Sequence, residues 1–502
     1  MLVLVDGVRV ASANTGSFAW EQLPLDAIQR IEIVRGPRAA QWGSDAIGGV
    51  IQIFTRKLDA AHFAVHVGSH GDYAESVGVG HWSARGGASV LVGARHVLGY
   101  PAINPQNFAY SPQPDGYSNQ NLAARFAWRF DKQALSGSLL RSDALVEFNQ
   151  GTSRVIEQAF GVRLNGALSD HLRQRVEVGT DREDLGTAAY RSLMLSRRNQ
   201  ASYQLAWSFE RTQDILAALD WMHERGISRD TASNIDTYTQ SRDNLGIYAG
   251  WYGHRGVWDW QLAARHDHNS VFGGATTGSA ATGYQVNNWV RIEASFVQGF
   301  RSPSLEEQFS PGYFGYYAGN PDLRPERSHS SEIDLLVQPF REAQIKLAGY
   351  STRVSNLITF AGSNYQAINI GRAAMDGLEL TASWSDGPWT NHVMGDYDDA
   401  RNALTGERLL RRPLRRGDIN VDRKLGRGVR GGIDLFAAGN ATDYGGATLG
   451  GYALLSAHVD WRLDRNLALR LFIENLLDRT YSLAYGYAAQ VRSGWVTLSW
   501  SP

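Results

Sequence analysis

The residues that could do chemistry do not form a catalytic pattern. The chain holds 13 histidines, but His62, His66, His70 and His81 lack the His-Glu-x-x-His spacing of a helical zinc site. No Gly-x-Ser-x-Gly turn presents a nucleophilic serine. The absence of cysteine excludes disulfides and thiolate metal ligands. The sequence therefore predicts neither a catalytic residue nor a set of metal ligands.

Composition favours an all-β protein. Hydrophobic residues make up 43% of the chain while the mean hydropathy is -0.31, so apolar residues are dispersed among polar ones and not gathered in blocks. The 53 Gly, 15 Trp, 21 Tyr and 18 Phe fit many strands, tight turns and aromatic residues at membrane interfaces. The net charge of -1 gives no reason to expect nucleic acid as a partner.

The sequence restricts how the chain could cross a membrane. No stretch approaches the roughly 18 consecutive apolar residues of a transmembrane helix, so a membrane protein with this sequence has to be a β-barrel. Residues 1–7 lack the basic segment and the cleavage site of a secretion signal. Either the protein is cytosolic or its natural N-terminus lies upstream. We expect an N-terminal truncation, because the chain begins abruptly inside a strand pattern.

From about residue 58 onward, segments of roughly ten residues alternate in polarity between Gly-, Asn- and Asp-rich stretches. In residues 290–296, Ile292 and Phe296 lie on one face of the predicted strand, and Arg291 and Glu293 lie on the other. A soluble sandwich or propeller would also alternate. Long charged side chains in successive inward positions instead fit a water-filled lumen, which solvates them.

Short and long connections also alternate along the chain. Short turns at 168–171 and 464–466 contrast with long segments at 100–120 and 301–327. Short turns on one side and long loops on the other are typical of transmembrane β-barrels. The roughly 445 residues after residue 57 would give about 20 residues for each strand and connection in a barrel of about 22 strands.

Motifs along the chain resemble those of one family. Leu-Val-Leu-Val-Asp-Gly-Val-Arg at 2–9, Ile-Glu-Ile-Val-Arg-Gly-Pro-Arg at 31–38 and Gly-Ser-Asp-Ala-Ile-Gly-Gly at 43–49 are similar to the second half of the plug domain of TonB-dependent receptors. Asn-Pro-Asp-Leu-Arg-Pro-Glu at 320–326 and Ile-Glu-Asn-Leu-Leu-Asp-Arg at 473–479 resemble barrel motifs of the same family. The resemblance covers nearly the whole chain.

The resemblance implies an all-β fold with two domains. The C-terminal part of a plug domain, residues 1–57, is expected inside the lumen of a 22-stranded antiparallel transmembrane β-barrel formed by residues 58–502. It also implies a bacterial outer-membrane receptor that binds a scarce large nutrient and imports it into the periplasm. The energy would come from the periplasmic domain of TonB, a partner whose strand-adding binding box is absent from this chain.

Other expectations concern partners and alternatives. A monomer is expected in contact with outer-membrane lipid and lipopolysaccharide, and not with nucleic acid. The aromatic segment 309–317 could contact a large ligand or lipopolysaccharide, or it could belong to an interfacial girdle. The basic run 408–416 could meet anionic sugar phosphates or the periplasmic surface, or it could be a solvated loop. Receptor function without enzyme activity is the leading hypothesis, and a passive pore or a barrel enzyme is the alternative of another class.

Charged residues of the plug motifs are expected to hold the plug against the polar barrel wall through charge-assisted hydrogen bonds. They are Asp6, Arg35, Arg38 and Asp45. Some of these ion pairs would break if the plug is remodelled during transport.

Within the family, the chain looks most like the cobalamin transporter branch, on the basis of residues 3–9, Trp-Gly-Ser-Asp at 42–45 and Tyr-Gly-Tyr at 485–487. Cobalamin would be a transported ligand and not a cofactor, and a ferric siderophore is the alternative. The positions that match the ligand-contacting loops of the family's plug are Ser12, Asn14, Thr15, Ser17, Trp42 and Ser44. Small polar side chains could hydrogen-bond the amides around a corrin and Trp42 could stack against its rim, or these residues could be solvated turn residues.

Calcium in the outer loops is the remaining candidate ligand. Asp115, with Asp143 and either Asp181 or Asp184 at a distance, is the one suggestive group of carboxylates. Ca²⁺ takes six or more oxygen ligands, and no dense cluster of Asp is present in the sequence.

Overall fold

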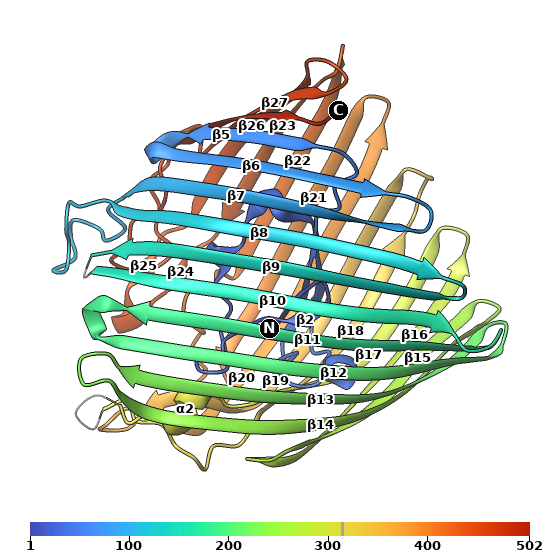
Figure 1. The fold of residues 1–502 in the computed structure, drawn as a ribbon, viewed down its shortest axis with the longest axis horizontal. Coiled ribbons are helices and arrows are strands. Elements are labelled where there is room, and N and C mark those ends of the chain that lie inside the picture. Colours follow the sequence, from blue (N-terminus) through green and yellow to red (C-terminus); the bar gives the residue numbers. More distant parts are fainter. Residues whose placement is uncertain (150, 313–315) are drawn as a thin grey trace.

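The computed structural model describes residues 1–149, 151–312 and 316–502, and its main body is a closed β-barrel (Figure 1). The centre of the predicted aromatic segment 309–317 therefore lies outside the described residues. Twenty-two strands form the barrel, and each pairs antiparallel with both of its neighbours. The predicted all-β fold class, a 22-stranded antiparallel barrel with a plug inside, is confirmed.

The barrel closes where its last strand meets its first, because β28 (Ser493–Trp500) pairs with β5 (His62–Gly68). The other barrel strands follow in chain order. They are β6 (Asp72–Trp82), β7 (Gly86–Tyr100), β8 (Asp115–Phe130), β9 (Gln133–Phe148), β10 (Gly151–Ala167), β11 (Leu172–Thr187), β12 (Ser192–Glu210), β13 (Gln213–Asp230), β14 (Ile235–Arg255), β15 (Trp258–Asn269), β16 (Gly273–Asn287), β17 (Val290–Arg301), β18 (Glu326–Val337), β19 (Ala343–Ala361), β20 (Gln366–Asp386), β21 (Trp389–Asn402), β22 (Arg415–Gly426), β23 (Val429–Ala438), β26 (Tyr452–Arg462) and β27 (Leu467–Glu474).

The alternating polarity of the sequence places apolar side chains on the outside of the barrel. In β17, Ile292 and Phe296 point outward, with 42% and 44% of their surface exposed. Arg291 and Glu293 point into the lumen, where they form an ion pair at 2.6 Å. A lumen filled by water and polar groups can accept such charges on its wall, and a packed apolar core could not.

The connections at the two ends of the barrel differ in length. One end carries tight turns, such as those after β6, β8 and β12, and we call it the short-turn end. The other end carries the connections 101–114, 302–325, 403–414, 439–451 and 475–492, and we call it the long-loop end. Of the helices in the described part of the chain, none has the length and apolar character needed to cross a bilayer.

Short elements lie within these connections. The small strands β24 (Ala441–Thr442) and β25 (Thr448–Leu449) pair with each other at the long-loop end. The short helices of the barrel domain are η3 (Ser69–Gly71), η4 (Ala188–Tyr190), α2 (Leu305–Phe309) and η5 (Tyr444–Gly446).

The first 55 residues form a small plug inside the barrel, drawn in dark blue in Figure 1. Its sheet has the order β2-β1-β4-β3, with β1 parallel to β4. The elements are β1 (Leu2–Val5), β2 (Val8–Arg9), η1 (Trp20–Gln22), η2 (Leu25–Ala27), β3 (Ile28–Arg35), α1 (Ala39–Trp42) and β4 (Gly49–Thr55). Asp6 and Gly7 form the tight turn between β1 and β2, with positive φ angles of 48° and 97°. The predicted domain boundary at residue 57 falls between β4 and β5.

The plug packs against two parts of the barrel wall, because Leu2 and Leu4 form a buried cluster with Ala275 and Phe300. Val5, Val8 and Val10 form a buried apolar cluster with Leu91 and Leu140 of the wall. The opposite edge strand, β3, faces open lumen, because Ile31, Ile33 and Val34 are 45%, 59% and 44% exposed. The apolar side chains of β3 are therefore left exposed, and this strand reaches the wall at its end, where Arg35 pairs with Glu379.

Candidate functional site

The plug loop that follows β2 forms the upper surface of the plug, towards the long-loop end. A compact turn shapes it, since the amide of Ser12 donates to the carbonyl of Ser17 at 2.9 Å and the amide of Gly16 donates back to Ser12 at 2.8 Å. Ser12 and Asn14 are completely buried, whereas Ser17 is exposed to the lumen. Of the predicted ligand-contacting residues in this loop, Thr15 and Ser17 are the accessible ones.

Asn14 ties the loop to the barrel wall. Its side-chain amide donates to the carbonyl of Leu195 on β12 at 3.0 Å, and its amide oxygen accepts from the hydroxyl of Tyr238 on β14 at 3.0 Å. The backbone amide of Ala13 also donates to the hydroxyl of Ser196 at 2.7 Å. The structure therefore uses Asn14 to hold the plug in place.

A segment of the long connection after β17 folds inward over this loop, and we call residues 302–309 the strap. It contains α2, whose N-cap Ser304 forms a reciprocal capping box with Glu307. The next two amides of α2 serve the plug: Leu305 donates to the carbonyl of Ala13 at 3.0 Å and Glu306 to that of Asn14 at 2.9 Å. First-turn amides have no partner within their own helix, so the plug carbonyls satisfy them.

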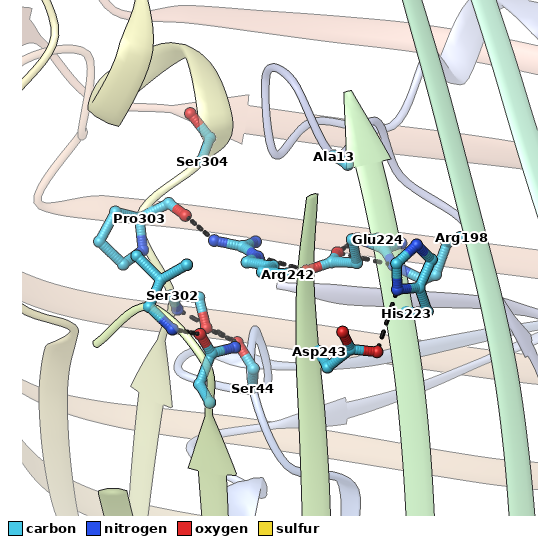
Figure 2. Close-up of polar contacts among 12 residues, drawn as sticks. Ala13, Ser44, Arg198, His223, Glu224, Arg242, Asp243, Ser302, Pro303 and Ser304 are labelled. Carbon is cyan, nitrogen blue, oxygen red and sulfur yellow. Dashed lines mark hydrogen bonds and ion pairs between the residues drawn. The ribbon is translucent and has the colours of Figure 1, made fainter. Parts of the chain in front are cut away.

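Ser44 makes a second contact between plug and strap. Its hydroxyl lies 2.8 Å from the hydroxyl of Ser302 and accepts from the backbone amide of Ser302 at 3.1 Å (Figure 2). Next to it, the amide of Asp45 donates to the carbonyl of Phe300 at 3.0 Å. Ser44 is only 4% exposed. Two separate plug loops are thus joined to one segment of the barrel.

A buried ion triad on the wall supports both contacts. Glu224 on β13 accepts from Arg198 on β12 at 2.6 Å and from Arg242 on β14 at 2.5 Å (Figure 2). The three side chains are at most 5% exposed. Arg198 also donates to the plug carbonyl of Ala11 at 3.0 Å, and Arg242 donates to the strap carbonyl of Pro303 at 2.5 Å. The triad therefore links plug, wall and strap in one hydrogen-bonded network.

Arg301 fixes the base of the strap. Its guanidinium donates to both carboxylate oxygens of Glu307 at 3.0 Å and to both of Glu326 at 2.8 and 3.0 Å. Paired two-bond contacts of this kind hold a guanidinium in one orientation. The strap is therefore anchored at its base and at its tip.

The accessible part of the upper plug surface is more aromatic than the sequence analysis predicted. Trp20 is 47% exposed, and the hydroxyl of Tyr117 on β8 donates to the carbonyl of Glu21 at 2.6 Å. A cavity of about 350 Å³ lies between this part of the plug and the wall and is lined by Glu21, Tyr117, Arg95 and Trp495 among others. Aromatic walls with a few polar groups are typical of sites for large ligands.

Trp42 lies in a different place from the upper loop. It ends α1 and lines a second cavity of about 320 Å³ together with Ser44, Arg175 and Tyr252. Arg175 and Tyr252 lie three residues from the short-turn ends of β11 and β14. This cavity therefore reaches the short-turn half of the lumen, beneath the strap contact.

The four charged plug residues have distinct surroundings. Asp6 accepts from the amide and hydroxyl of Thr55 at 3.1 and 2.5 Å, and Arg125 of the wall lies 3.5 Å from it. Arg35 forms an ion pair with Glu379 of the wall. Arg38 donates to the carbonyl of Pro37 at 2.9 Å. The side chain of Asp45 accepts from Ser44 at 2.9 Å. The structure brings Arg35 and Asp6 against wall charges, whereas Asp45 reaches the wall through its backbone.

The carboxylates considered for calcium lie apart. Asp115 accepts from the amide of Ala102 at 2.9 Å, and Asp143 pairs with Arg154 at 2.9 Å. Asp184 pairs with Arg182 on the outer face, whereas Asp181 is buried against the plug. Within residues 1–149, 151–312 and 316–502, no group of three or more His, Cys, Asp or Glu side chains is arranged to hold a metal ion.

Asp443 joins the outer loops to one another. It is buried and accepts from Arg411 at 2.9 Å, from the amide of Tyr485 at 2.7 Å and from that of Tyr444 at 2.8 Å. Burial raises the pKa of this carboxyl, but the amides of Tyr485 and Tyr444 and the Arg411 guanidinium outweigh it and bring the pKa below the usual range. Its contribution to stability is therefore present at neutral pH and is lost as the pH falls through the lowered pKa.

Replacement of Asp443 by Asn should loosen the outer loops that Asp443 joins, because a neutral asparagine side chain cannot form the ion pair with Arg411. We expect proteolytic cleavage within 403–414 and 475–492 to become about tenfold faster at neutral pH. Limited proteolysis followed by mass spectrometry measures this rate. Asp464→Asn, in an exposed turn at the short-turn end, is the matched control. Equal cleavage rates in the two variants would contradict the role given to Asp443.

The network residues Arg198, Glu224, Arg242 and Arg301 were missed by the sequence analysis. Each lies on a strand of alternating polarity, so nothing in the local pattern distinguishes it from other lumen-facing charges. The capping box of Ser304 and Glu307 was visible as Ser-x-x-Glu and could have identified a helix within the long connection.

Comparisons with known proteins agree with this architecture. Residues 62–476 match the family model "TonB dependent receptor-like, beta-barrel", and residues 1–50 match "TonB-dependent Receptor Plug Domain". A curated relative, the vitamin B12 transporter BtuB of Photobacterium profundum, is 26% identical over an alignment 525 positions long, which covers 100% of this chain and 84% of the relative.

Solved structures share the fold at lower identity. The ferric enterobactin receptor PfeA of Pseudomonas aeruginosa superposes with a TM-score of 0.85 at 17% identity, covering 100% of this chain and 90% of that one. The siderophore receptor PirA of Acinetobacter baumannii gives 0.82 at 16% identity, with 100% and 90% covered. Because the barrel model spans most of the chain and the plug model precedes it, the chain belongs to the TonB-dependent receptor family, a family of receptors and transporters.

Proposed function

We propose that this protein is an outer-membrane receptor that binds cobalamin at the long-loop end of the barrel and imports it into the periplasm, with energy delivered by the periplasmic domain of TonB. The barrel would stand in the outer membrane as a monomer, with its long loops outside. The observation that carries the proposal is a plug inside the barrel whose upper loops are bonded to an inward-folded strap. Such a plug closes the lumen beneath a ligand and has defined contacts to release.

Support for cobalamin comes from the relative that is 26% identical and is named a vitamin B12 transporter. The upper plug surface fits a large ligand with amide groups, since it combines the hydroxyls of Thr15 and Ser17 with the exposed ring of Trp20. The cavity of about 350 Å³ beside Glu21 extends this surface towards the wall. We assign no enzyme activity and no resident cofactor.

A ferric siderophore is the second candidate ligand. Solved structures with this fold include receptors named for ferric enterobactin and for a siderophore. Arg95 and Arg470 line the cavity beside Glu21 and could attract an anionic chelate. Their charges are partly matched, because Arg95 pairs with Asp72 at 2.7 Å and Arg470 lies 3.5 Å from Asp460.

The ligand is tested by titration of the folded chain of residues 1–502. Cobalamin and several ferric siderophores are added separately, and the quenching of tryptophan fluorescence is followed. We expect saturable binding of cobalamin that is tighter than that of any iron chelate. Replacing Trp20 by Ala should remove most of the quenching. Preferential binding of an iron chelate would instead establish the siderophore alternative.

A passive pore is the candidate from another class, and the exposed face of β3 favours it. Ile31, Ile33 and Val34 face open lumen, so the plug described here does not fill the barrel. Single-channel recording in planar bilayers separates the two functions. If the protein is a receptor, we expect no steady ion conductance beyond that of a closed barrel. A large constant conductance would support the passive pore.

A further inference from the structure

A row of arginines crosses the outer face of neighbouring barrel strands. Arg182 on β11 stands directly opposite Arg197 on β12, and Arg197 stands directly opposite Arg225 on β13. On the other side, Arg182 opposes Gln158, which opposes Arg141 on β9. We call Arg141, Arg182, Arg197 and Arg225 the arginine row.

The pleat of the strands fixes the direction of these side chains. The residues next in sequence, Glu183, Arg198 and Glu224, are buried on the lumen side at 5%, 4% and 1% exposure. Alternate residues of a strand point to opposite faces, so Arg182, Arg197 and Arg225 point away from the lumen. All three are exposed.

The charges of the row are only partly neutralised. Arg182 pairs with Asp184, and Arg141 lies 3.7 Å from Asp143. Among the described residues, neither Arg197 nor Arg225 forms an ion pair within 4.0 Å. Like charges directly opposite each other on adjacent strands destabilise a sheet. An external anion that bridges the guanidiniums would remove this cost.

The row marks the edge of the apolar belt of the barrel. On the same strands, towards the short-turn end, the outward residues become apolar, and Val178, Leu219 and Trp221 are 46%, 49% and 42% exposed. From Arg197 to Trp207 on β12, ten residues at about 3.3 Å each and a tilt of about 40° span about 25 Å along the membrane normal. That span matches the apolar band of a transmembrane barrel, so the row lies at the level of the outer headgroups.

We infer that the arginine row binds the phosphate groups of a phosphorylated glycolipid in the outer leaflet. The inference rests on the outer-membrane location proposed above. Guanidinium groups bind phosphate oxygens through two parallel hydrogen bonds, which suits a row of this kind better than isolated lysines would. Adjacent strands are about 4.8 Å apart, so Arg182, Arg197 and Arg225 span about 10 Å and fit one phosphorylated headgroup. The row lies on the wall of β9–β13 and not in the basic run 408–416.

The test uses the whole chain of residues 1–502 in lipid nanodiscs that contain diphosphorylated lipid A or its dephosphorylated form. Native mass spectrometry measures the bound lipid. The double variant Arg197→Gln and Arg225→Gln should bind diphosphorylated lipid A about 25-fold more weakly, since each basic residue near an anionic lipid surface contributes about fivefold. Excess inorganic phosphate should not displace the lipid, because the apolar belt holds the acyl chains beside the row.

Arg423→Gln is the matched control, because Arg423 is an exposed arginine near the short-turn end of β22, 4.8 Å from the ring centre of Trp389. It should bind lipid A like the unmodified chain. The inference would be overturned if the double variant and the control retained equal amounts of lipid A. It would also be overturned if the unmodified chain bound the two forms of lipid A equally. If the double variant loses lipid A and the unmodified chain does not bind cobalamin, the arginine row is supported and the proposed ligand is refuted. Failure of the chain to insert into a bilayer would overturn the membrane location and the row with it.

Discussion

Replacing Glu224 by Gln should lower the free energy of unfolding by about 3–5 kcal/mol, because two buried arginines lose the one carboxylate that both contact. Arg198 and Arg242 are 4% and 5% exposed, so water cannot replace the lost charge. Both arginines also donate to the plug or the strap. We therefore expect the variant to release the upper plug loop as well as to lose stability. Urea titration of the reconstituted chain measures the change in free energy.

Glu157→Gln is the matched control for Glu224. Glu157 is also a buried carboxyl group on the lumen face of the wall, at 6% exposure, but within the described residues it forms no ion pair with an arginine or lysine and lies beside the buried carboxyl of Asp181. Replacing a buried carboxyl group that has no cationic partner should leave stability unchanged within about 1 kcal/mol or increase it. Equal destabilisation by the two substitutions would show that Glu224 is no more than one lumen-facing carboxylate among several.

Arg301→Gln should destabilise the strap, since Glu307 and Glu326 both lose their partner and face each other across a half-buried site. The expected cost is about 3 kcal/mol. The amides of Leu305 and Glu306, which donate to the plug carbonyls of Ala13 and Asn14, should then exchange with deuterium at least tenfold faster, as expected for about 1.4 kcal/mol or more of local destabilisation. Hydrogen exchange followed by mass spectrometry measures both amides within one peptide.

An exposed arginine provides the comparison for Arg301. Arg353 on β19 makes the same two-bond contact with a carboxylate, that of Asp376, at 2.9 and 3.1 Å. The two side chains are 43% and 55% exposed, so Arg353→Gln should change stability by less than about 1 kcal/mol. If the hydrogen-exchange rates of the strap amides are unchanged in Arg301→Gln, Arg301 does not hold the strap against the plug.

The fold could be predicted from the sequence because its signals are local. Alternation in residues such as 290–296 gives the inward and outward faces of a strand without any knowledge of its neighbours, and the turn at Asp6 and Gly7 is set by two residues. The plug motifs placed the N-terminal segment inside the lumen by resemblance. Strand alternation and family motifs can both be recognised in the sequence without knowing which strands are neighbours in the barrel.

The candidate site was harder to predict from the sequence, because its contacts join residues that are far apart in the chain. Ser44 meets Ser302 across 258 residues, and Arg198 meets the carbonyl of Ala11 across 187. Alternation assigns a face to Arg198 but no partner, since the partner depends on the register of every strand between them. The same limit explains Asn14, which the sequence placed among the ligand-contacting or solvated turn residues and which is buried between β12, β14 and α2 in the structure.

The proposed import requires the plug to separate from the strap before a ligand can pass. The chain has no cysteine, and the hydroxyls of Ser44 and Ser302 lie 2.8 Å apart, so Ser44→Cys combined with Ser302→Cys can form one disulfide between plug and strap. The most direct measurement is uptake of labelled cobalamin by cells whose only cobalamin receptor carries both substitutions and is expressed from the natural gene, together with any coding sequence upstream of residue 1. With the disulfide formed, binding should be unchanged and uptake abolished, and a reductant should restore uptake to the level of either single variant. Full uptake with the disulfide intact would contradict this requirement.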